Sequence, residues 1–188
     1  MPKIIIDEAL KIHKKISCEQ SFRGLNRQGV IAASIYIACK MHNFPRTPNE
    51  IAEIFNLKNA SATKGCKNAI TIINFLEKEN NNKTYLHQTK PISFIERYCS
   101  KLFINDELTK LGKFIALQLE IRDSMYENTP NSIAAGIIYF ISNICHLKIS
   151  KKEVKEVSNI SEVTINKVFR KLLEMINELV PKVILEKY

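Results

Sequence analysis

The cysteines and histidines are the side chains whose chemistry would be easiest to recognise, because metal sites and disulfides use them at short, regular spacings. No CxxC pair is present, and no histidine stands three or four residues from another. The cysteines are odd in number and far apart, which argues against a zinc site and a disulfide framework. We therefore expect no bound metal, no cofactor, and small apolar core thiols in a reducing compartment. The cysteines are Cys18, Cys39, Cys66, Cys99 and Cys145, and the histidines are His13, His42, His87 and His146.

The sequence also lacks the motifs of enzyme active sites. It holds no glycine-rich phosphate loop, no nucleophile elbow and no cluster of carboxylates with histidine. Its carboxylates stand mostly at expected helix starts or on exposed faces, where capping and solubility explain them. We therefore expect a protein that is not an enzyme.

Positive charge is the feature that points to a partner. The 188 residues carry 28 Lys+Arg against 19 Asp+Glu, a net charge of +9, and the pI is about 9.3. The excess is +5 over residues 1–80 and +4 over 81–188, so it belongs to folded faces and not to a basic tail. This favours a polyanionic partner: nucleic acid, an anionic membrane or an acidic protein face. No apolar run approaches membrane-spanning length and no signal peptide opens the chain, so we expect no membrane span and a cytosolic or nuclear location.

The chain repeats itself with a shift of 103 residues, which aligns residues 29–76 with 132–179 without a gap. Ten of these 48 pairs are identical, where chance would give roughly three. Each copy opens with a segment that is apolar nearly all round, at 26–42 and 130–146, as in a helix at the centre of a domain. Glycine and proline are few. The sequence therefore predicts an all-α protein of two related units.

Each copy continues with the pattern of a helix-turn-helix motif: a short helix, a tight turn and a longer helix. Thr47 and Glu50 form a capping box before the first short helix, and Ser150 and Glu153 form the second. An ordinary helical hairpin is the alternative for one copy, but two copies on a basic chain favour DNA binding. The short helices are expected to end at Asn56 and Asn159, and the long helices to span residues 59–78 and 161–179.

The expected helices divide the chain into residues 1–80, a polar linker over 81–90, and residues 91–188. The first unit repeats the second, except that the helix opening the second unit has no counterpart. We therefore expect the first unit to lack its leading helix in this chain, and the parent protein to continue upstream of Met1. The second unit should contain helices at 91–103, 105–123, 130–146, 150–157 and 161–179. The first unit should open with a helix over residues 2–20, the counterpart of the helix over 105–123.

Two such units joined by a linker resemble the paired cyclin-like repeats of the transcription factor IIB family. The residues that carry the resemblance are Arg23-Gly24, Ile31–Lys40, Pro45-Arg46-Thr47, Phe94–Leu102, Asn131–Tyr139, Val163-Thr164-Ile165 and Phe169-Arg170. The resemblance covers almost the whole chain. It implies a monomeric general initiation factor core that clamps a TATA-binding protein on promoter DNA flanking a TATA element and bears on RNA polymerase. It also implies a nuclear location, or a cytoplasmic viral factory if the host is a virus.

The resemblance further implies which residues contact DNA. Val163 and Asn166 take base-reading positions on the second long helix, with Thr164 and Lys167 nearby. Asparagine prefers adenine, whereas the family commonly has a guanine-gripping arginine at this place. Leu25 also stands where the family often has arginine. The other expected DNA contacts are Arg23, Gly24 and Arg27 before the first central helix, Lys64 and Lys67 on the first long helix, Lys151 and Lys152 on the second short helix, and Arg170. For Lys151 and Lys152 the alternative is a solvated helix face without phosphate contact.

A protein-binding surface is implied for the first unit. Lys40 matches a basic position that faces an acidic patch of the TATA-binding protein, and Asn59 and Ala60 fall where the family carries lysines. A different class of function is also open, because cyclins share the helical unit: a protein-only regulatory subunit of a kinase, without DNA affinity.

Overall fold

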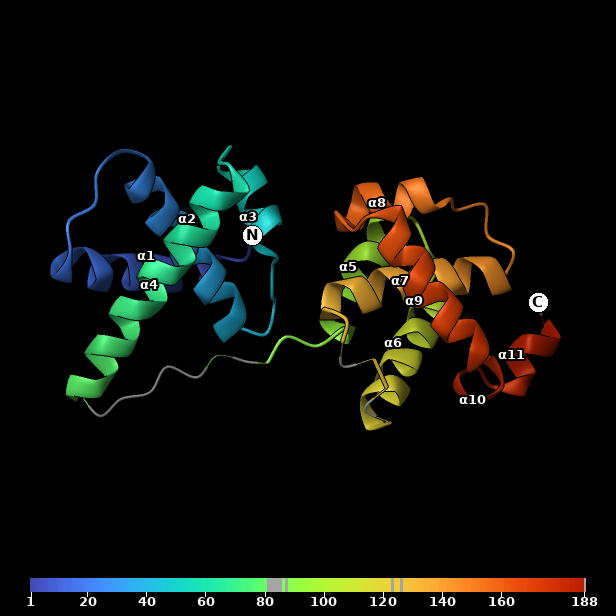
Figure 1. Cartoon of the computed structure of the whole chain (residues 1–188). Coiled ribbons are helices and arrows are strands. Elements are labelled where there is room, and N and C mark those ends of the chain that lie inside the picture. The colour runs from blue at the N-terminus through green and yellow to red at the C-terminus, as the bar shows by residue number, and fades with distance from the viewer. Residues whose placement is uncertain (81–85, 87, 123, 126, 188) are drawn as a thin grey trace. The chain divides into compact units, whose positions relative to one another are not determined.

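The computed structural model describes residues 1–80, 86, 88–122, 124, 125 and 127–187 of the chain. All regular secondary structure in these residues is α-helical (Figure 1), which confirms the expected fold class. The chain divides into two compact units, Met1–Thr89 and Lys90–Tyr188, each with a core of its own. Most of the expected linker, residues 81–85 and 87, lies outside the described residues.

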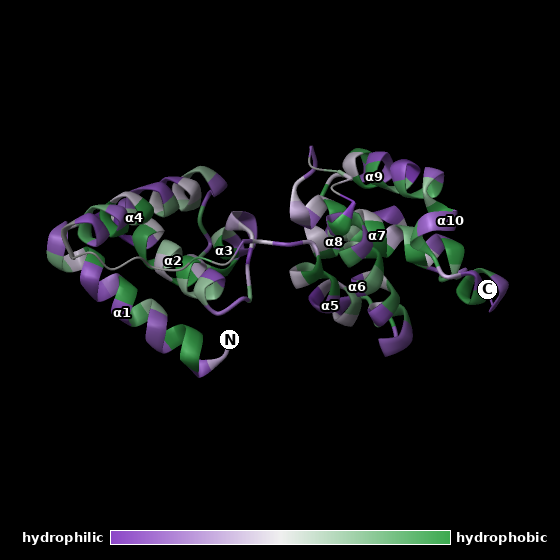
Figure 2. Ribbon diagram, turned by 90° about the horizontal axis from the view of Figure 1, so that it is seen from below, coloured by the Kyte–Doolittle hydropathy of each residue, from purple (hydrophilic) through white to green (hydrophobic). Residues whose placement is uncertain are grey.

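The first unit is built around one central helix. Its helices are α1 (Lys3–Glu19), α2 (Gly24–Met41), α3 (Pro48–Ile54) and α4 (Asn59–Asn80). Helix α2 packs most extensively on α4 and then on α1. Figure 2 shows hydrophobic and hydrophilic residues alternating along α1, and its buried side chains Ile5, Ile12 and Ile16 follow helical spacing. The apolar side chains of α1 thus close one side of the first core.

The second unit repeats this arrangement and adds helices at both ends. Its helices are α5 (Ile92–Lys101), α6 (Asp106–Ile121), α7 (Pro130–Ile144), α8 (Lys151–Ser158), α9 (Glu162–Glu174), α10 (Ile176–Leu179) and α11 (Lys182–Lys187). Helix α7 is central and is buried along most of its length, and α5, α6, α8 and α9 pack on it. The duplication seen in the sequence is thus present in the fold. Helices α1, α3 and α4 begin at Lys3, Pro48 and Asn59, each 103 residues before the starts of α6, α8 and α9 at Asp106, Lys151 and Glu162.

Several expected helices end earlier in the structure, and those expected over 105–123 and 130–146 stop at Ile121 and Ile144. The expected helix over 161–179 stops at Glu174, and Met175 leaves the helical path with φ −107° and ψ 14°. The break lets Leu179 and Val180 turn into the core of the second unit, where both are buried. The expected helix over 91–103 stops at Lys101, and Phe103 adopts a left-handed backbone with φ 55°. At Met175 a local apolar pattern continues where tertiary packing turns the chain. At Phe103 local hydrogen bonds turn the chain, among them the one from the Ile104 N–H to the Cys99 carbonyl.

The described helices include none that is both long enough and apolar enough to cross a membrane. The central helices α2 and α7 are the most apolar of the longer helices, and both are packed within their units. Their apolar surface therefore belongs to the two protein cores.

Candidate nucleic-acid interface

A reciprocal cap fixes the start of α8 in the second unit. The Glu153 backbone N–H donates to Ser150 Oγ at 3.3 Å, and the Ser150 backbone N–H donates to the Glu153 carboxylate at 2.7 Å. The Ser150 hydroxyl donates to the same carboxylate at 2.7 Å. These hydrogen bonds, the backbone one foremost, hold the pKa of Glu153 below its ordinary value. The second capping box expected from the sequence is therefore confirmed.

The turn between α8 and α9 is held by hydrogen bonds on both sides. Asn159 closes α8 in the left-handed conformation, with φ 57° and ψ 25°, which asparagine tolerates better than most residues. Ser158 Oγ donates to the carbonyl of Val154 at 2.7 Å and accepts the N–H of Ile160 at 3.2 Å. Ser161 then caps α9 by accepting the N–H of Thr164 at 3.2 Å. The direction of α9 is thus set by short-range contacts.

Helix α9 has a buried face and a solvent face. Ile165, Val168 and Leu172 are fully buried against the core. The solvent face carries Val163, Asn166, Lys167 and Arg170, whose spacing of three and four residues places them on one side of the helix. The side chain of Val163 is 80% exposed. Thr164 lies at the edge, with its hydroxyl 2.8 Å from Ser161 Oγ.

The two candidate lysines of α8 have different surroundings. The ammonium of Lys151 lies 5.4 Å from the centre of the Tyr139 ring, and the side chain is partly buried. Lys152 is exposed. Lys155, on the same short helix, forms an ion pair of 3.7 Å with Glu162 at the start of α9. Lys152 is therefore the α8 lysine best placed for a phosphate, and Lys151 would have to leave the aromatic ring.

A close helix crossing positions α9 on the central helix α7. A Cβ atom on Gly136 would lie 2.2 Å from Cγ1 of Val168, so only glycine fits there at this separation. One turn further along α7, the Tyr139 ring meets the Phe169 ring edge-on, with the centres 4.9 Å apart. The solvent face of α9 is thus presented by a tightly packed support.

The first unit repeats the motif with other residues at the surface. Thr47 Oγ1 accepts the N–H of Glu50 at 3.1 Å, and the Thr47 N–H donates to the Glu50 carboxylate at 2.7 Å, so this capping box is also confirmed. Arg46 adds an ion pair of 3.7 Å with Glu50. Lys64 and Lys67 are exposed on α4, three residues apart. They form a basic pair on the helix that corresponds to α9.

The segment before α2 holds three of the expected DNA contacts. Arg23 precedes the helix with an extended backbone, and Gly24 has φ +55°, which side chains rarely allow. Arg23 and Arg27 are both exposed. Arg27 also lines a shallow pocket of about 210 Å³ together with His13 and Ser17. Glycine at position 24 therefore serves the turn, and the two arginines supply the positive charge.

The residues expected at a protein-binding surface lie at two helix ends. Lys40 is in the last turn of α2, partly buried, with its ammonium 6.0 Å from the Tyr36 ring centre. Asn59 and Ala60 are exposed at the start of α4. These positions offer one cation and two small uncharged side chains.

The thiols have the character of packing residues. All five are free, and four are buried as expected. Cys18 is exposed, so the expectation of a core thiol is wrong at that position. Burial raises the pKa of Cys66 to about 11 and also raises the pKa values of Cys99 and Cys145. In the part of the chain that the structure describes, no group of three or more His, Cys, Asp or Glu side chains is arranged to hold a metal ion.

Two features of the surface were not foreseen from the sequence. Tyr139 lies in the segment 130–146, which was expected to form a buried central helix, yet its side chain is partly exposed and its ring forms the platform for Lys151. Phe103 was placed inside a helix, yet it is 96% exposed at a turn. The first contact joins residues on different helices and has no sequence signal. Asn105, which caps the next helix, was an available signal that the chain turns at Phe103.

Comparison with known proteins agrees with this geometry. The family described as transcription factor TFIIB repeat matches residues 1–70 and 84–175 of the chain. A transcription initiation factor IIB-like protein of Acanthamoeba polyphaga mimivirus is 33% identical over 190 residues, covering 92% of this chain and 40% of that protein.

Cellular relatives are similar to nearly the same extent. Transcription initiation factor IIB of Encephalitozoon cuniculi is 30% identical over 188 residues, covering all of this chain and 57% of that protein. Its counterpart in Methanothrix thermoacetophila is 30% identical over 171 residues, covering 91% and 48%. The chain spans about half the length of the relatives that it matches.

Proposed function

Since this chain belongs to the transcription factor TFIIB repeat family, we propose that it is the core of a general transcription initiation factor. In this role it binds promoter DNA flanking a TATA element together with a TATA-binding protein, and helps to recruit RNA polymerase. It acts as a monomer without catalysis, in the nucleus or, in a viral host, in a cytoplasmic viral factory.

The solvent face of α9 is the observation that carries the proposal. Its first turn is fixed by the Ser161 cap and leaves Val163 80% exposed. An isolated apolar side chain suits the methyl group of thymine in a major groove, which an α-helix enters readily. Asn166, one turn further along, supplies the amide group that pairs best with adenine. Lys167 and Arg170 on the same face are placed for phosphate oxygens.

The first unit contributes charge and a protein surface to the same complex. Lys64 and Lys67 neutralise phosphates from α4, and Arg23 and Arg27 do so from the segment before α2. These contacts position the chain without reading sequence. Lys40, Asn59 and Ala60 lie at helix ends where a TATA-binding protein would dock.

A gel-shift experiment tests the proposal. Promoter DNA with a TATA element is mixed with a TATA-binding protein, and this chain is then added at two salt concentrations. We expect a slower complex that needs both proteins and weakens with salt, with a log–log slope of about 0.9 for each phosphate contacted. The proposal is refuted if adding this chain produces no slower complex at either salt concentration. If the chain captures a kinase and is not retained on DNA, the cyclin-like alternative is supported.

Matched variants separate positioning contacts from base readout. Lys167→Ala should weaken binding to all sequences alike and reduce the salt slope by about one, whereas Asn166→Ala should change the preferred bases. Lys110→Ala is the control, because Lys110 is an exposed lysine of α6, paired with Asp106 at 2.7 Å and outside the helix-turn-helix motif. If Asn166→Ala and Lys167→Ala have equal effects on every sequence, direct readout by α9 is excluded.

A further inference from the structure

Phe103 is the most conspicuous residue of the second unit outside α8 and α9. Its side chain is 96% exposed, and its backbone has a left-handed φ of 55°. This conformation is unfavourable for a residue with a bulky side chain. Asparagine occupies the same conformation at other turns of this chain, namely at Asn43, Asn56 and Asn159. An aromatic residue is therefore unfavourable here for two reasons: its backbone is left-handed, and its apolar ring is exposed to solvent.

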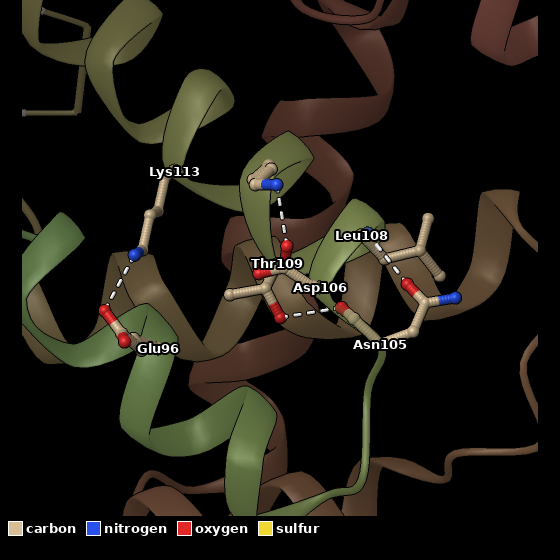
Figure 3. Close-up of polar contacts among 7 residues, drawn as sticks. Glu96, Asn105, Asp106, Leu108, Thr109 and Lys113 are labelled. Atoms are coloured by element: carbon tan, nitrogen blue, oxygen red, sulfur yellow. Dashed lines mark hydrogen bonds and ion pairs between the residues drawn. The ribbon is translucent and has the colours of Figure 1, made fainter.

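Hydrogen bonds of the turn hold the Phe103 side chain outward. The N–H of Ile104 donates to the carbonyl of Cys99 at 3.0 Å, which closes the end of α5. Asn105 then caps α6 by accepting the N–H of Leu108 at 2.9 Å, and its carbonyl accepts the hydroxyl of Thr109 at 2.8 Å (Figure 3). The position of Phe103 is therefore fixed by its neighbours and not by packing of its own ring.

A pocket of about 260 Å³ lies beside Phe103. Its second wall is the segment between α7 and α8, which Ser142 holds in place: the hydroxyl of Ser142 lies 3.3 Å from the carbonyl oxygen of Leu147 and 3.4 Å from that of Ile149. The volume is below the range of about 300–1,000 Å³ usual for small-molecule sites and suits one or two apolar side chains. The pocket is lined by Leu102, Phe103, Ile104, Asn105, Leu108, Leu147, Lys148 and Ile149.

The charge around the pocket is positive. Lys148 belongs to its lining, and Lys101 stands in the last turn of α5, two residues before Phe103. Within the described residues, neither lysine has an ion-pair partner. The carboxylates that follow on α6 are already paired, Asp106 with Lys110 at 2.7 Å and Glu107 with Lys187 at 2.6 Å. A negatively charged segment would therefore meet two available cations and no uncompensated carboxylate.

We propose that this pocket is a docking site for an acidic peptide segment of a partner protein that carries a large apolar side chain. The apolar side chain enters the pocket and packs against Phe103, while flanking carboxylates approach Lys148 and Lys101. Burial of the ring removes the cost of exposing it, which is how large aromatic side chains act at interface centres. The site is separate from the α9 face and does not depend on the DNA-binding function.

Fluorescence anisotropy with a synthetic peptide tests this assignment. The probe is a short labelled peptide in which phenylalanine and leucine alternate with aspartate. Phe103→Asn should weaken its binding about tenfold or more, as expected for loss of a buried aromatic contact. Asparagine adopts the left-handed turn easily, so the variant should fold at least as stably as the parent chain. Lys148→Gln should weaken binding about threefold, in the range of a surface ion pair.

Two controls distinguish this pocket from the basic DNA-binding face. Lys167→Gln should leave peptide affinity unchanged, and Phe103→Asn should leave DNA binding unchanged. Amide resonances of Leu102–Asn105 and Leu147–Ile149 should move when the peptide is added. The proposal is overturned if a peptide with asparagine in place of aspartate binds equally well, or if Phe103→Asn has no effect. It is also overturned if sedimentation shows that Phe103 mediates pairing of two copies of the chain.

Discussion

Replacing Gly65 by alanine should destabilise the first unit by forcing α2 and α4 apart. A Cβ atom on Gly65 would lie 2.1 Å from the carbonyl oxygen of Gly29, 2.3 Å from its carbonyl carbon and 2.7 Å from its Cα. Cβ atoms essentially never approach other atoms more closely than 3.0 Å, so the helices have to separate by about 0.9 Å. The obstructing atoms are all backbone, which cannot rotate away as a side chain would.

Two opposing contributions set the size of the effect. Alanine is favoured over glycine inside a helix by about 1 kcal/mol, whereas an added methyl group in a packed crossing costs about 1–3 kcal/mol and occasionally more. Because backbone is the obstacle, we expect the upper part of that range and a net loss of about 2 kcal/mol in the free energy of unfolding. For a unit of this size, the melting temperature should fall by about 10 °C.

Calorimetry of the whole chain, with urea unfolding followed by circular dichroism, measures this loss. Gly112→Ala in α6 is the matched control, because its Cβ would lie 3.1 Å from methyl carbons of Ile141 and Ile95 that can shift. We expect Gly112→Ala to be nearly neutral and Gly65→Ala to lower the transition of the first unit. If Gly65→Ala is as stable as the parent chain, the close crossing of α2 and α4 does not limit the fold and this reasoning is refuted.

Three further predictions concern thiols, a helix cap and the second crossing. Cys18 should be the one thiol of the native chain that reacts rapidly with a disulfide reagent, and the four buried cysteines should react only after unfolding. The pKa of Glu153 is lowered in the folded state, so the stability that its charge contributes is fully present above the ordinary pKa of 4.5 and is lost as the pH falls through the folded-state pKa. The difference in the free energy of unfolding between the parent chain and Glu153→Gln, measured by urea unfolding, should therefore vanish in acid. Gly136→Ala should cost about 1–3 kcal/mol in the same assay. Val168→Ala should cost less in the Gly136→Ala background than in the parent chain, because it removes the Cγ1 atom that the new Cβ would meet at 2.2 Å.

The elements foreseen from the sequence are those that depend on residues close together in the chain. The capping boxes at Thr47 and Ser150 need only a partner three residues away, and both formed as expected. The repeat with a shift of 103 residues predicted that helices of the two units begin at corresponding positions, because the two copies share the spacing of their apolar residues. The left-handed Asn159 was predicted from the tolerance of asparagine for that conformation.

The features that were missed depend on residues far apart in the chain. The break at Met175 follows from the burial of Leu179 against the rest of the second unit, although the local pattern favours one helix. The stacking of Lys151 on Tyr139 joins two helices whose approach is set by the whole core. Sequence periodicity reports which face of a helix is apolar, and it does not report which neighbour that face meets.

Helices α4 and α9 occupy corresponding places in the two units but present different side chains to DNA. Both helices carry cations after the first turn, Lys64 and Lys67 on α4 and Lys167 and Arg170 on α9, so we expect both helices to contact phosphates. At the first turn the side chains diverge, from small and uncharged on α4 to a large exposed apolar group and an amide on α9. The corresponding pairs are Ala60 and Val163, Thr63 and Asn166, Lys64 and Lys167, and Lys67 and Arg170. Since phosphate contacts carry no sequence information and groove contacts do, we expect base preference to reside in the second unit, while the first unit adds affinity and a surface for protein.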